Sequence, residues 1–239
     1  MLQASRSIKP SKWLVASARH THCSASNTLS SSAPRRPVSY TSPRPHRLVV
    51  GITGATGTIY AIRLLEVLKQ LNIETHLVIS KWGLATLKYE TPHSIEKISS
   101  LATTTYSPRD VSAAPASGSF QHDGMMIVPC SMKSLAAIRC GLGDDLISRS
   151  ADVSLKEGRK LMLVVRETPL HDIHLENMLA VRRSGAIIFP PVPAFYTQPK
   201  TLDDLVEQSV GRMLDLMGIH TDAFPRWTGF EQEKKNGKL

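Results

Sequence analysis

The sequence of 239 residues has no apolar run approaching the roughly 20 residues that a helix needs to cross a bilayer, so we expect no membrane-spanning helix and no membrane partner. Its three cysteines, Cys23, Cys130 and Cys140, are odd in number and lack a C-x-x-C spacing. A disulfide-stapled extracellular fold is therefore not expected, and a reducing compartment fits better. With 41% hydrophobic and 21% charged residues, the composition is that of a globular chain.

Acidic residues are absent from the first 45 positions, and the first one in the chain is Glu66. Segment 1–45 holds seven Lys or Arg residues, which leaves about +2 of the formal charge of +9 for the remaining 194 residues. A nearly neutral domain lacks the basic surface that nucleic-acid binding requires, so no nucleic-acid partner is expected.

The same segment is rich in Ser and Arg and carries short apolar pieces such as Trp13-Leu14-Val15. This composition is typical of an organelle transit peptide rather than of a secretory signal. We therefore expect a cleavable mitochondrial leader over 1–45 and a mitochondrial location. A plain disordered tail is the alternative.

Strand and helix patterns alternate through the rest of the chain. Short apolar runs predict strands over 47–52, 75–79, 125–128, 160–165 and 186–189, and helical spacing predicts helices over 59–71, 132–139, 150–157, 172–183 and 201–217. Residues 82–116 show only weak periodicity and predict a helical piece followed by a loop. The alternation indicates an α/β fold with a single doubly wound, Rossmann-like parallel sheet flanked by helices. We place this domain at 46–227 and a polar, disordered tail at 228–239.

The turn after the first strand, Gly51–Gly57, brings backbone N–H groups to a helix N-terminus, where an anion can bind. It matches neither the dinucleotide fingerprint nor a P-loop, and a structural tight turn is the alternative. A dinucleotide site would place an acid at the end of the second strand, whereas this chain has Ser80-Lys81. A phosphate or a flavin mononucleotide suits that pair better than NAD.

A second hydroxyl-rich turn, Pro129–Ser134, also opens a helix, and an ordinary N-cap by Ser131 is as plausible there as an anion contact. Cys130 is interpreted as a buried thiol rather than a nucleophile. His171 and His174 lack a third ligand at metal-binding spacing, so capping or packing is favoured and no metal is expected.

Charged residues gather near the predicted crevice at the strand ends, where desolvation calls for anionic partners. The cations are Arg149, Lys156, Arg166 and Arg212. Glu167, beside Arg166, and Glu90 are candidate carboxylates for proton transfer or cation stabilisation. The proline-stiffened segment Pro190–Tyr196 holds Phe195 and Tyr196 either as an aromatic rim over a cofactor or as a subunit contact.

Seven stretches together resemble the UbiX-type flavin prenyltransferases, whose fungal members were long called phenylacrylic acid decarboxylases. The resemblance runs from about Arg47 to Trp227. The stretches are Gly51–Gly57, Ala116–Phe120, Pro129–Ser131, Ala151–Glu157, Val165–Pro169, His174–Met178 and Pro191–Tyr196.

The resemblance implies a flavoprotein enzyme that joins the dimethylallyl group of dimethylallyl monophosphate to N5 and C6 of reduced FMN, without a metal. The product, prenylated FMN, would serve a UbiD-type decarboxylase that acts on aromatic or cinnamic-type acids. The resemblance also implies a homo-oligomer, a dodecamer. Cations that hold a leaving phosphate and an aromatic pocket that shelters an allylic cation agree with this chemistry.

Site residues follow from the resemblance by position. FMN would be held by Gly54, Ala55, Thr56, Ser80, Ser131, Met132, Lys133, Ser134, Arg149 and Arg166. The prenyl phosphate would be surrounded by Glu90, Lys156, Arg166, Tyr196 and Arg212, and Glu167 would lie near the reacting flavin edge. Glu167, Lys156, Glu90 and Thr56 would take part in catalysis. Thr56 departs from the family, which usually has Ser there, and Val111 and Ser112 stand where some bacterial members have Trp.

Two other functions compete with this one. FMN-dependent decarboxylases of peptidyl or pantothenoyl cysteine share the architecture but carry P-A-S-A-N-T and P-x-M-N-x-x-M-W segments. This chain has Pro115–Phe120 and Pro129–Ser134 in their place, which favours the transferase. A non-catalytic FMN-binding module would bind FMN without consuming the prenyl phosphate.

Overall fold

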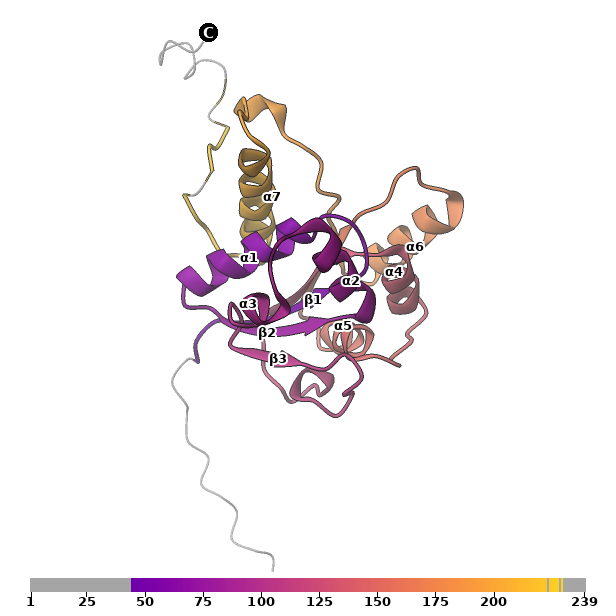
Figure 1. Ribbon diagram of the computed structural model, residues 1–239. Coiled ribbons are helices and arrows are strands. Elements are labelled where there is room, and N and C mark those ends of the chain that lie inside the picture. The colour runs from indigo at the N-terminus through magenta and orange to yellow at the C-terminus, as the bar shows by residue number, and fades with distance from the viewer. Residues whose placement is uncertain (1–43, 223, 228, 230–239) are drawn as a thin grey trace, which may run out of the picture. The chain divides into compact units, whose positions relative to one another are not determined.

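A computed structural model describes residues 44–222, 224–227 and 229 (Figure 1). The expected leader lies outside the described residues except for Arg44 and Pro45, and so does the expected tail except for Gly229. Arg44 is fixed to the domain, because its guanidinium donates to both carboxylate oxygens of Asp123 at 2.8 and 2.9 Å.

Strands and helices alternate along the described chain. The strands are β1 (Arg47–Ile52), β2 (Glu74–Ile79), β3 (Thr104–Tyr106), β4 (Gly124–Cys130), β5 (Lys160–Val165) and β6 (Ile187–Ile188). The helices are α1 (Thr58–Gln70), α2 (Lys81–Glu90), α3 (Ile95–Ser99), α4 (Met132–Arg139), α5 (Leu146–Lys156), α6 (Asp172–Arg183) and α7 (Leu202–Met217). Two short 3₁₀ turns lie at Ala114–Ala116 and Phe195–Thr197.

The strands form one sheet in the order β3-β2-β1-β4-β5-β6, and every pairing is parallel. The predicted doubly wound, Rossmann-like α/β fold is therefore confirmed. Strand order reverses between β1 and β4, and crevices for ligands open at such a switch point, beyond the carboxyl ends of the strands.

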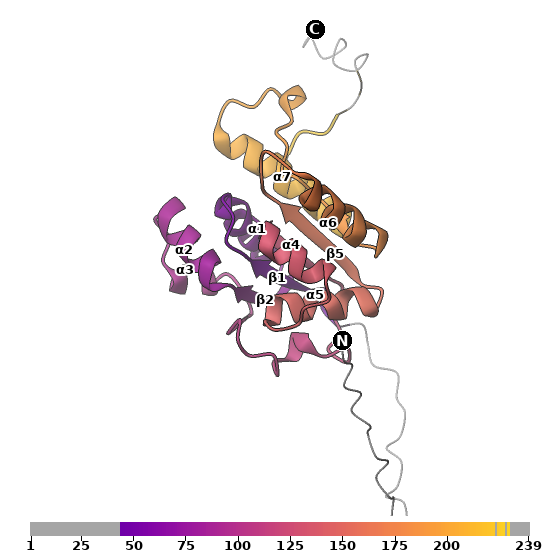
Figure 2. The same ribbon diagram turned by 90° about the vertical axis from the view of Figure 1, so that its right-hand side faces the viewer.

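Helices cover both faces of the sheet, because successive strand side chains point to opposite sides. Leu48, Val50 and Ile52 of β1 pack with α1 and α7, whereas Val49 packs with α4, α5 and α6 in a second apolar cluster. Figure 2 shows α4, α5 and α6 together on one side of the strands. With both faces buried, the central strands are almost wholly apolar.

Two sequence predictions need correction. The sheet has a sixth strand, β3, within the stretch predicted as a helix and a loop; its three residues are partly exposed at the sheet edge and carry no apolar run. Helix α5 begins at Leu146 rather than at residue 150. Asp145 caps it, since its carboxylate accepts the N–H of Ser148 at 2.8 Å.

Candidate functional site

A cavity of about 660 Å³ lies at the switch point between β1 and β4, at the carboxyl ends of the strands. Its size is within the range of sites that hold a cofactor-sized ligand. The lining residues are Thr53, Gly54, Ser80, Lys81, Trp82, Pro108, Arg109, Ser131, Met132, Lys133, Ser134, Asp145, Ile147 and Glu167.

Three helices begin at this cavity, and their N-cap residues Ser80, Ser131 and Asp145 all line it. The Ser80 hydroxyl accepts the N–H of Gly83 at 3.0 Å, which leaves its own proton available to a ligand. Ser131 is confirmed as the N-cap of α4. Converging helix N-termini make the cavity favourable for a phosphate group.

Thr53 ties the two central strand ends together. Its hydroxyl donates to the carbonyl of Pro129 at 2.8 Å and accepts the N–H of Ser131 at 2.8 Å. The side chain is buried, so these bonds form away from water. The two glycine- and serine-rich turns are therefore held in fixed register across the switch point.

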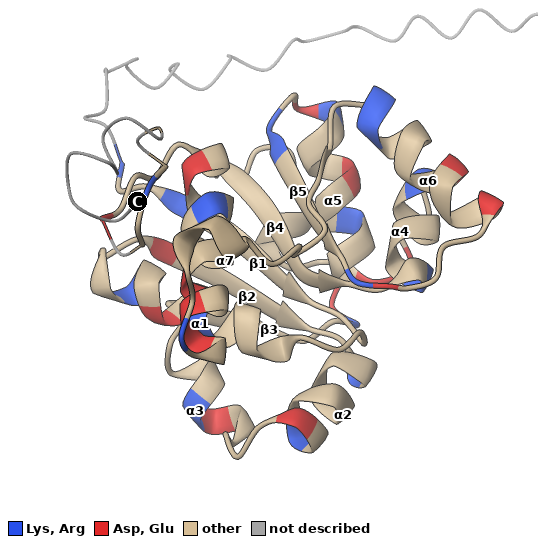
Figure 3. Cartoon of the chain, turned by 90° about the horizontal axis from the view of Figure 1, so that it is seen from above, with Lys and Arg blue, Asp and Glu red and all other residues tan. Residues whose placement is uncertain are grey.

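Three cations and two carboxylates line the cavity: Lys81, Arg109, Lys133, Asp145 and Glu167. Lys133 Nζ lies 3.9 Å from the Asp145 carboxylate, and the Glu167 carboxylate accepts the N–H of Thr168 at 2.9 Å. The cavity thus has a small excess of positive charge. Elsewhere the charges are mixed, as the blue and red segments on the outer helices show (Figure 3).

Glu90, at the end of α2, closes the N-terminus of α1. Its carboxylate accepts the N–H groups of Gly57 and Thr58, both at 2.9 Å. Burial opposes the charge of Glu90, but hydrogen bonds from Thr56, Thr58 and Gly57 outweigh it and hold the pKa of Glu90 below its usual value. The carboxylate therefore remains ionised at the helix end where its charge is favoured.

The structure brings together at one cavity seven of the site residues that the resemblance implied. These are Gly54, Ser80, Ser131, Met132, Lys133, Ser134 and Glu167. Ala55 follows Gly54 in the same turn, and Thr56 lies at the Glu90 carboxylate. Arg166 directly follows β5, where its N–H donates to the carbonyl of Cys130 at 3.2 Å, next to the cavity residue Ser131.

Lys156 does not reach the cavity of its own chain. Helix α5 begins at the cavity with Asp145 and Ile147, and its 11 residues carry the chain about 16 Å to Lys156 at the other end. There the ammonium group pairs with Glu157. Arg149 lies one turn into α5, where it donates to Asp152 at 2.8 Å and to the carbonyl of Ala116 at 3.2 Å.

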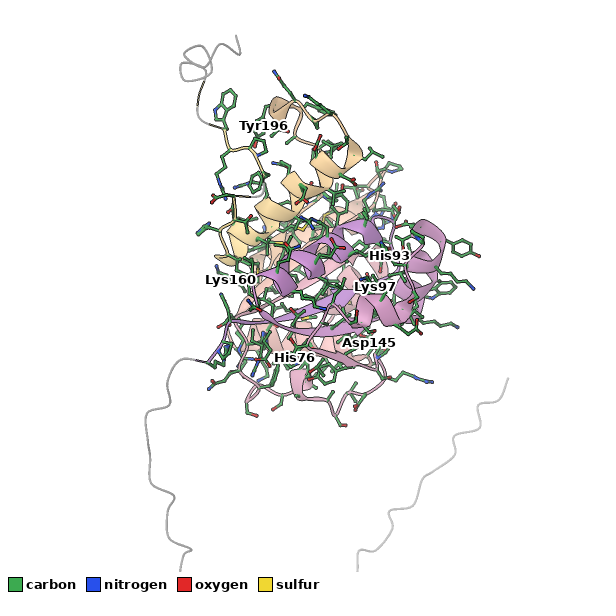
Figure 4. All side chains as sticks on the ribbon, turned by 60° about the vertical axis from the view of Figure 1, so that its left-hand side comes forward. His76, His93, Lys97, Asp145, Lys160 and Tyr196 are labelled. Carbon is green, nitrogen blue, oxygen red and sulfur yellow. The ribbon has the colours of Figure 1, made fainter. Side chains whose placement is uncertain are left out.

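Tyr196 and Arg212 also lie away from the cavity. Figure 4 shows Tyr196 at the opposite end of the molecule from the cavity residue Asp145. The Tyr196 ring meets Trp227 edge-on at 5.8 Å, and Arg212 donates to Asp215 at 3.2 Å. Phe195 is 73% exposed, so within this chain neither aromatic forms a rim over the cavity.

Five lining residues were not assigned roles from the sequence: Trp82, Pro108, Arg109, Asp145 and Ile147. Asp145 was recognisable as an N-cap three residues before Ser148. Trp82 directly follows the Ser80-Lys81 pair. Arg109 lies in the stretch with weak periodicity, and only the fold places it here, because the Pro108 carbonyl accepts the N–H of Leu146 at 2.8 Å.

Two other interpretations can now be compared with the structure. Cys130 is fully buried, and burial raises the pKa of its thiol to about 12, which confirms a buried thiol. His171 is the N-cap residue of α6, and its ring stacks on that of His174 with centroids 3.6 Å apart, which confirms packing.

Among the described residues, no group of three His, Cys, Asp or Glu side chains is placed to hold a metal ion. None of the helices described there has the length and apolarity to cross a membrane.

The cavity suits FMN. Serine hydroxyls and helix N-termini match an anionic phosphate, Lys81 and Lys133 supply positive charge, and Trp82, Met132 and Ile147 offer apolar surface for an aromatic ring. No acid follows β2 to take ribose hydroxyls, since Ser80-Lys81 stands there.

Comparison with known proteins places the chain in a family. The flavoprotein family matches residues 36–214. The mitochondrial flavin prenyltransferase PAD1 of Saccharomyces cerevisiae is 69% identical over 191 residues, which cover 80% of this chain and 79% of the yeast protein.

Two solved structures are also similar. AnUbiX (PadA1), in complex with FMN and dimethylallyl pyrophosphate, is 57% identical with a TM-score of 0.78, covering 78% of this chain and all of that one. A dodecameric FMN-dependent UbiX-like decarboxylase from Escherichia coli O157:H7 is 52% identical with a TM-score of 0.75, covering 77% of this chain and all of that one. The resemblance predicted from the motifs is thus confirmed, and this chain belongs to the UbiX-like flavin prenyltransferases of the flavoprotein family.

Proposed function

We propose that this protein transfers the dimethylallyl group from dimethylallyl monophosphate to N5 and C6 of reduced FMN, with release of inorganic phosphate and prenylated FMN. The 69% identity with the yeast flavin prenyltransferase, over a domain that builds this cavity, carries the proposal. The carbon–oxygen bond to the phosphate breaks as the bond to N5 forms, and N5 loses its proton. The carbon–carbon double bond of the prenyl group is then consumed: one of its carbons takes up a proton, the other bonds to C6, and C6 loses its proton.

Residues from three turns at the carboxyl ends of the strands would hold FMN. Gly54, Ala55 and Thr56 come from the β1–α1 turn, Ser131–Ser134 from the start of α4, and Ser80 from the start of α2. Bound reduced FMN supplies the nucleophilic N5 and C6. The helix N-termini would orient its phosphate, since their N–H groups face the cavity.

Glu167 is the carboxylate that we assign to the reacting flavin edge, because it alone among the proposed catalytic residues lines the cavity. There it would stabilise positive charge on the prenyl carbon and accept the proton that C6 loses. Glu90 would hold the Thr56 turn in place through α1.

Lys156, Tyr196 and Arg212 would act in a neighbouring subunit. They lie outside the cavity of their own chain, and the related E. coli protein is a dodecamer. A symmetric homo-oligomer, by family resemblance also a dodecamer, would bring these side chains of one copy to the flavin of the next. The cations Lys156 and Arg212, together with Tyr196, would then bind the phosphate of the prenyl substrate before and after it leaves.

The direct test is anaerobic incubation of the purified protein with reduced FMN and dimethylallyl monophosphate, followed by mass spectrometry of the flavin. We expect a flavin heavier by one prenyl unit, and a rate at least 100-fold lower for Glu167→Gln. A parallel reaction with dimethylallyl pyrophosphate, the ligand of the AnUbiX structure, tests phosphate specificity. Unmodified FMN after prolonged incubation would support a non-catalytic binding module, and release of CO₂ from a peptidyl cysteine would support the decarboxylase.

Subunit complementation tests the shared site. Glu167→Gln and Lys156→Ala are each expected to be inactive as homo-oligomers. Co-expressed, they would form mixed oligomers in which some cavities hold an intact Glu167 and a neighbour's intact Lys156, so part of the activity returns. If Lys156 acted within its own chain, every mixed cavity would lack one of the two residues and no activity would return.

The product would pass to a UbiD-type decarboxylase of aromatic or cinnamic-type acids, and the reaction would take place in the mitochondrion. The yeast relative is a mitochondrial protein, and segment 1–45 has the composition of a transit peptide. Protein-free filtrate from the reaction should activate an apo-decarboxylase of this type. Deleting residues 2–43 should abolish mitochondrial import of a fluorescent fusion.

A further inference from the structure

Trp82 is the one aromatic side chain among the residues that line the cavity. It lies in the first turn of α2, two residues after the N-cap Ser80. Two-thirds of its surface, 67%, is exposed, although a large indole is normally better buried. An exposed indole in a cavity suited to a flavin is available to a ligand.

The β1–α1 turn makes room for this side chain. A Cβ on Gly54 would overlap Trp82 Cβ and would lie 3.1 Å from the Trp82 carbonyl carbon. The φ angle of Gly54 is not positive, so the glycine is needed for close approach rather than for backbone conformation. The FMN-binding turn and Trp82 are thus packed directly against each other.

Lys81, the residue before Trp82, also contacts the indole. Its Nζ lies 5.8 Å from the Trp82 ring centroid, within the distance of a cation–π contact. A partly ordered ring loses less conformational entropy when a ligand binds it. The neighbouring cation also adds positive charge beside the cavity.

We infer that Trp82 contacts the isoalloxazine ring of FMN and positions it in the cavity, an inference that rests on the proposed function. The flavin ring is flat and aromatic, and the indole offers the largest flat apolar surface in the cavity wall. Trp82 fills this role because neither Phe195 nor Tyr196 is among the residues that line the cavity of their own chain. It is a positioning residue, since Glu167 remains the group assigned to the reacting edge.

Tyr89 provides a matched control on the same helix. It lies two turns beyond Trp82, is 91% exposed and is not part of the cavity wall. If the exposed aromatics of α2 serve only as a subunit contact, replacing Trp82 or Tyr89 by alanine should change the affinity for FMN to the same extent. If Trp82 binds flavin, only Trp82 should affect flavin affinity.

The experiment titrates the full-length protein with oxidised FMN and measures the dissociation constant and the sedimentation coefficient. We expect Trp82→Ala to raise the dissociation constant about tenfold and Trp82→Phe to raise it less than about threefold. Tyr89→Ala should leave it unchanged. Wild-type affinity in Trp82→Ala, or equal losses in Trp82→Ala and Tyr89→Ala, would overturn the inference in favour of a subunit contact.

Flavin emission gives a second readout that does not depend on affinity. An indole in contact with oxidised flavin quenches its fluorescence by electron transfer, and this quenching needs contact distance. FMN bound to Trp82→Phe should therefore be several-fold brighter than FMN bound to the wild type or to Tyr89→Ala. Equal emission from all three proteins would overturn the inference even if Trp82→Ala failed to fold.

These outcomes separate the inference from the proposed function. A Trp82-dependent FMN complex that forms no prenylated flavin would leave the inference intact and refute the transferase. Conversely, a full yield of prenylated flavin together with Trp82-independent binding would keep the transferase and refute the role of Trp82.

Discussion

The hydroxyl of Thr53 accepts the N–H of Ser131 across the gap between β1 and β4, at 2.8 Å. The same hydroxyl donates to the carbonyl of Pro129 at 2.8 Å, so one side chain joins both turns of the cavity. With 2% of its surface exposed, Thr53 makes these bonds without competition from water.

Thr53→Val should destabilise the protein and weaken FMN binding together. Valine has nearly the same shape but leaves the Ser131 N–H without an acceptor, which costs about 1–3 kcal/mol in the free energy of unfolding. The FMN dissociation constant should rise because the α4 turn loses its fixed position. Urea unfolding and flavin titration measure the two effects. Thr53→Ser keeps the hydroxyl and should retain most of the stability and most of the affinity for FMN. Equal losses in Thr53→Val and Thr53→Ser would show that the hydroxyl is not the cause.

Glu90→Gln tests whether the ionised carboxylate stabilises the start of α1. The pKa of Glu90 is lower in the folded state than in the unfolded chain, so its contribution to stability is present above its unfolded pKa and disappears as the pH falls through its folded pKa. Glutamine should lower the free energy of unfolding by about 0.5–1 kcal/mol at pH 7. The difference from wild type should shrink as the pH falls below the unfolded-state pKa of Glu90 and vanish once the folded-state carboxyl is protonated. A difference that stays constant with pH would argue against the charge and for shape alone.

The sequence predicted an element correctly where the residues of that element form a clear pattern of apolar positions. Strands β1 and β5 are buried on both faces, so their continuous apolar runs gave the correct bounds. The first turn of α5 was hidden because buried Ser148 stands there in place of an apolar residue, and buried Ser150 follows it. Ser150 is accommodated by donating its hydroxyl to the Leu146 carbonyl at 2.6 Å.

The site residues likewise fall into two groups, one that the strand pattern predicts and one that it does not. Ser80 and Ser131 directly follow strands and Glu167 is the second residue after one, and parallel strands bring such residues to one edge of the sheet wherever the helices lie. The position of Lys156 depends instead on the length and direction of α5, and that of Tyr196 on an arm that leads away from the sheet. Only the three-dimensional fold therefore shows that Lys156 and Tyr196 lie away from the cavity of their own chain.

Asp123→Asn should lower the free energy of unfolding by weakening the attachment of the first residues of the domain. Burial disfavours the Asp123 charge, but hydrogen bonds from Arg44, the Arg47 N–H and His46 outweigh it and hold the pKa well below its usual value. The stabilisation is therefore present above about pH 4 and is lost as the pH falls further. We expect a loss of about 1–2 kcal/mol at pH 7 by urea unfolding, discounted for partial exposure, that shrinks below pH 4.

Asp144→Asn is the control for that experiment, because it removes the same charge from an exposed position. It should change the free energy of unfolding by less than about 0.5 kcal/mol at either pH. A similar loss in both variants would mean that net charge, rather than the Asp123 hydrogen bonds, sets the stability.

Gly211→Ala should destabilise α7 although alanine is the better helix former. A Cβ at Gly211 would overlap the ring of Phe224, which packs over the helix and is buried. Displacing that ring should cost about 1–3 kcal/mol, more than the roughly 1 kcal/mol that alanine gains over glycine in a helix. Phe224→Ala removes the obstacle, so adding Gly211→Ala in that background should raise the free energy of unfolding. A change of sign between the two backgrounds, measured by urea unfolding, identifies close packing as the cause; a loss in both would show that the glycine serves the helix itself.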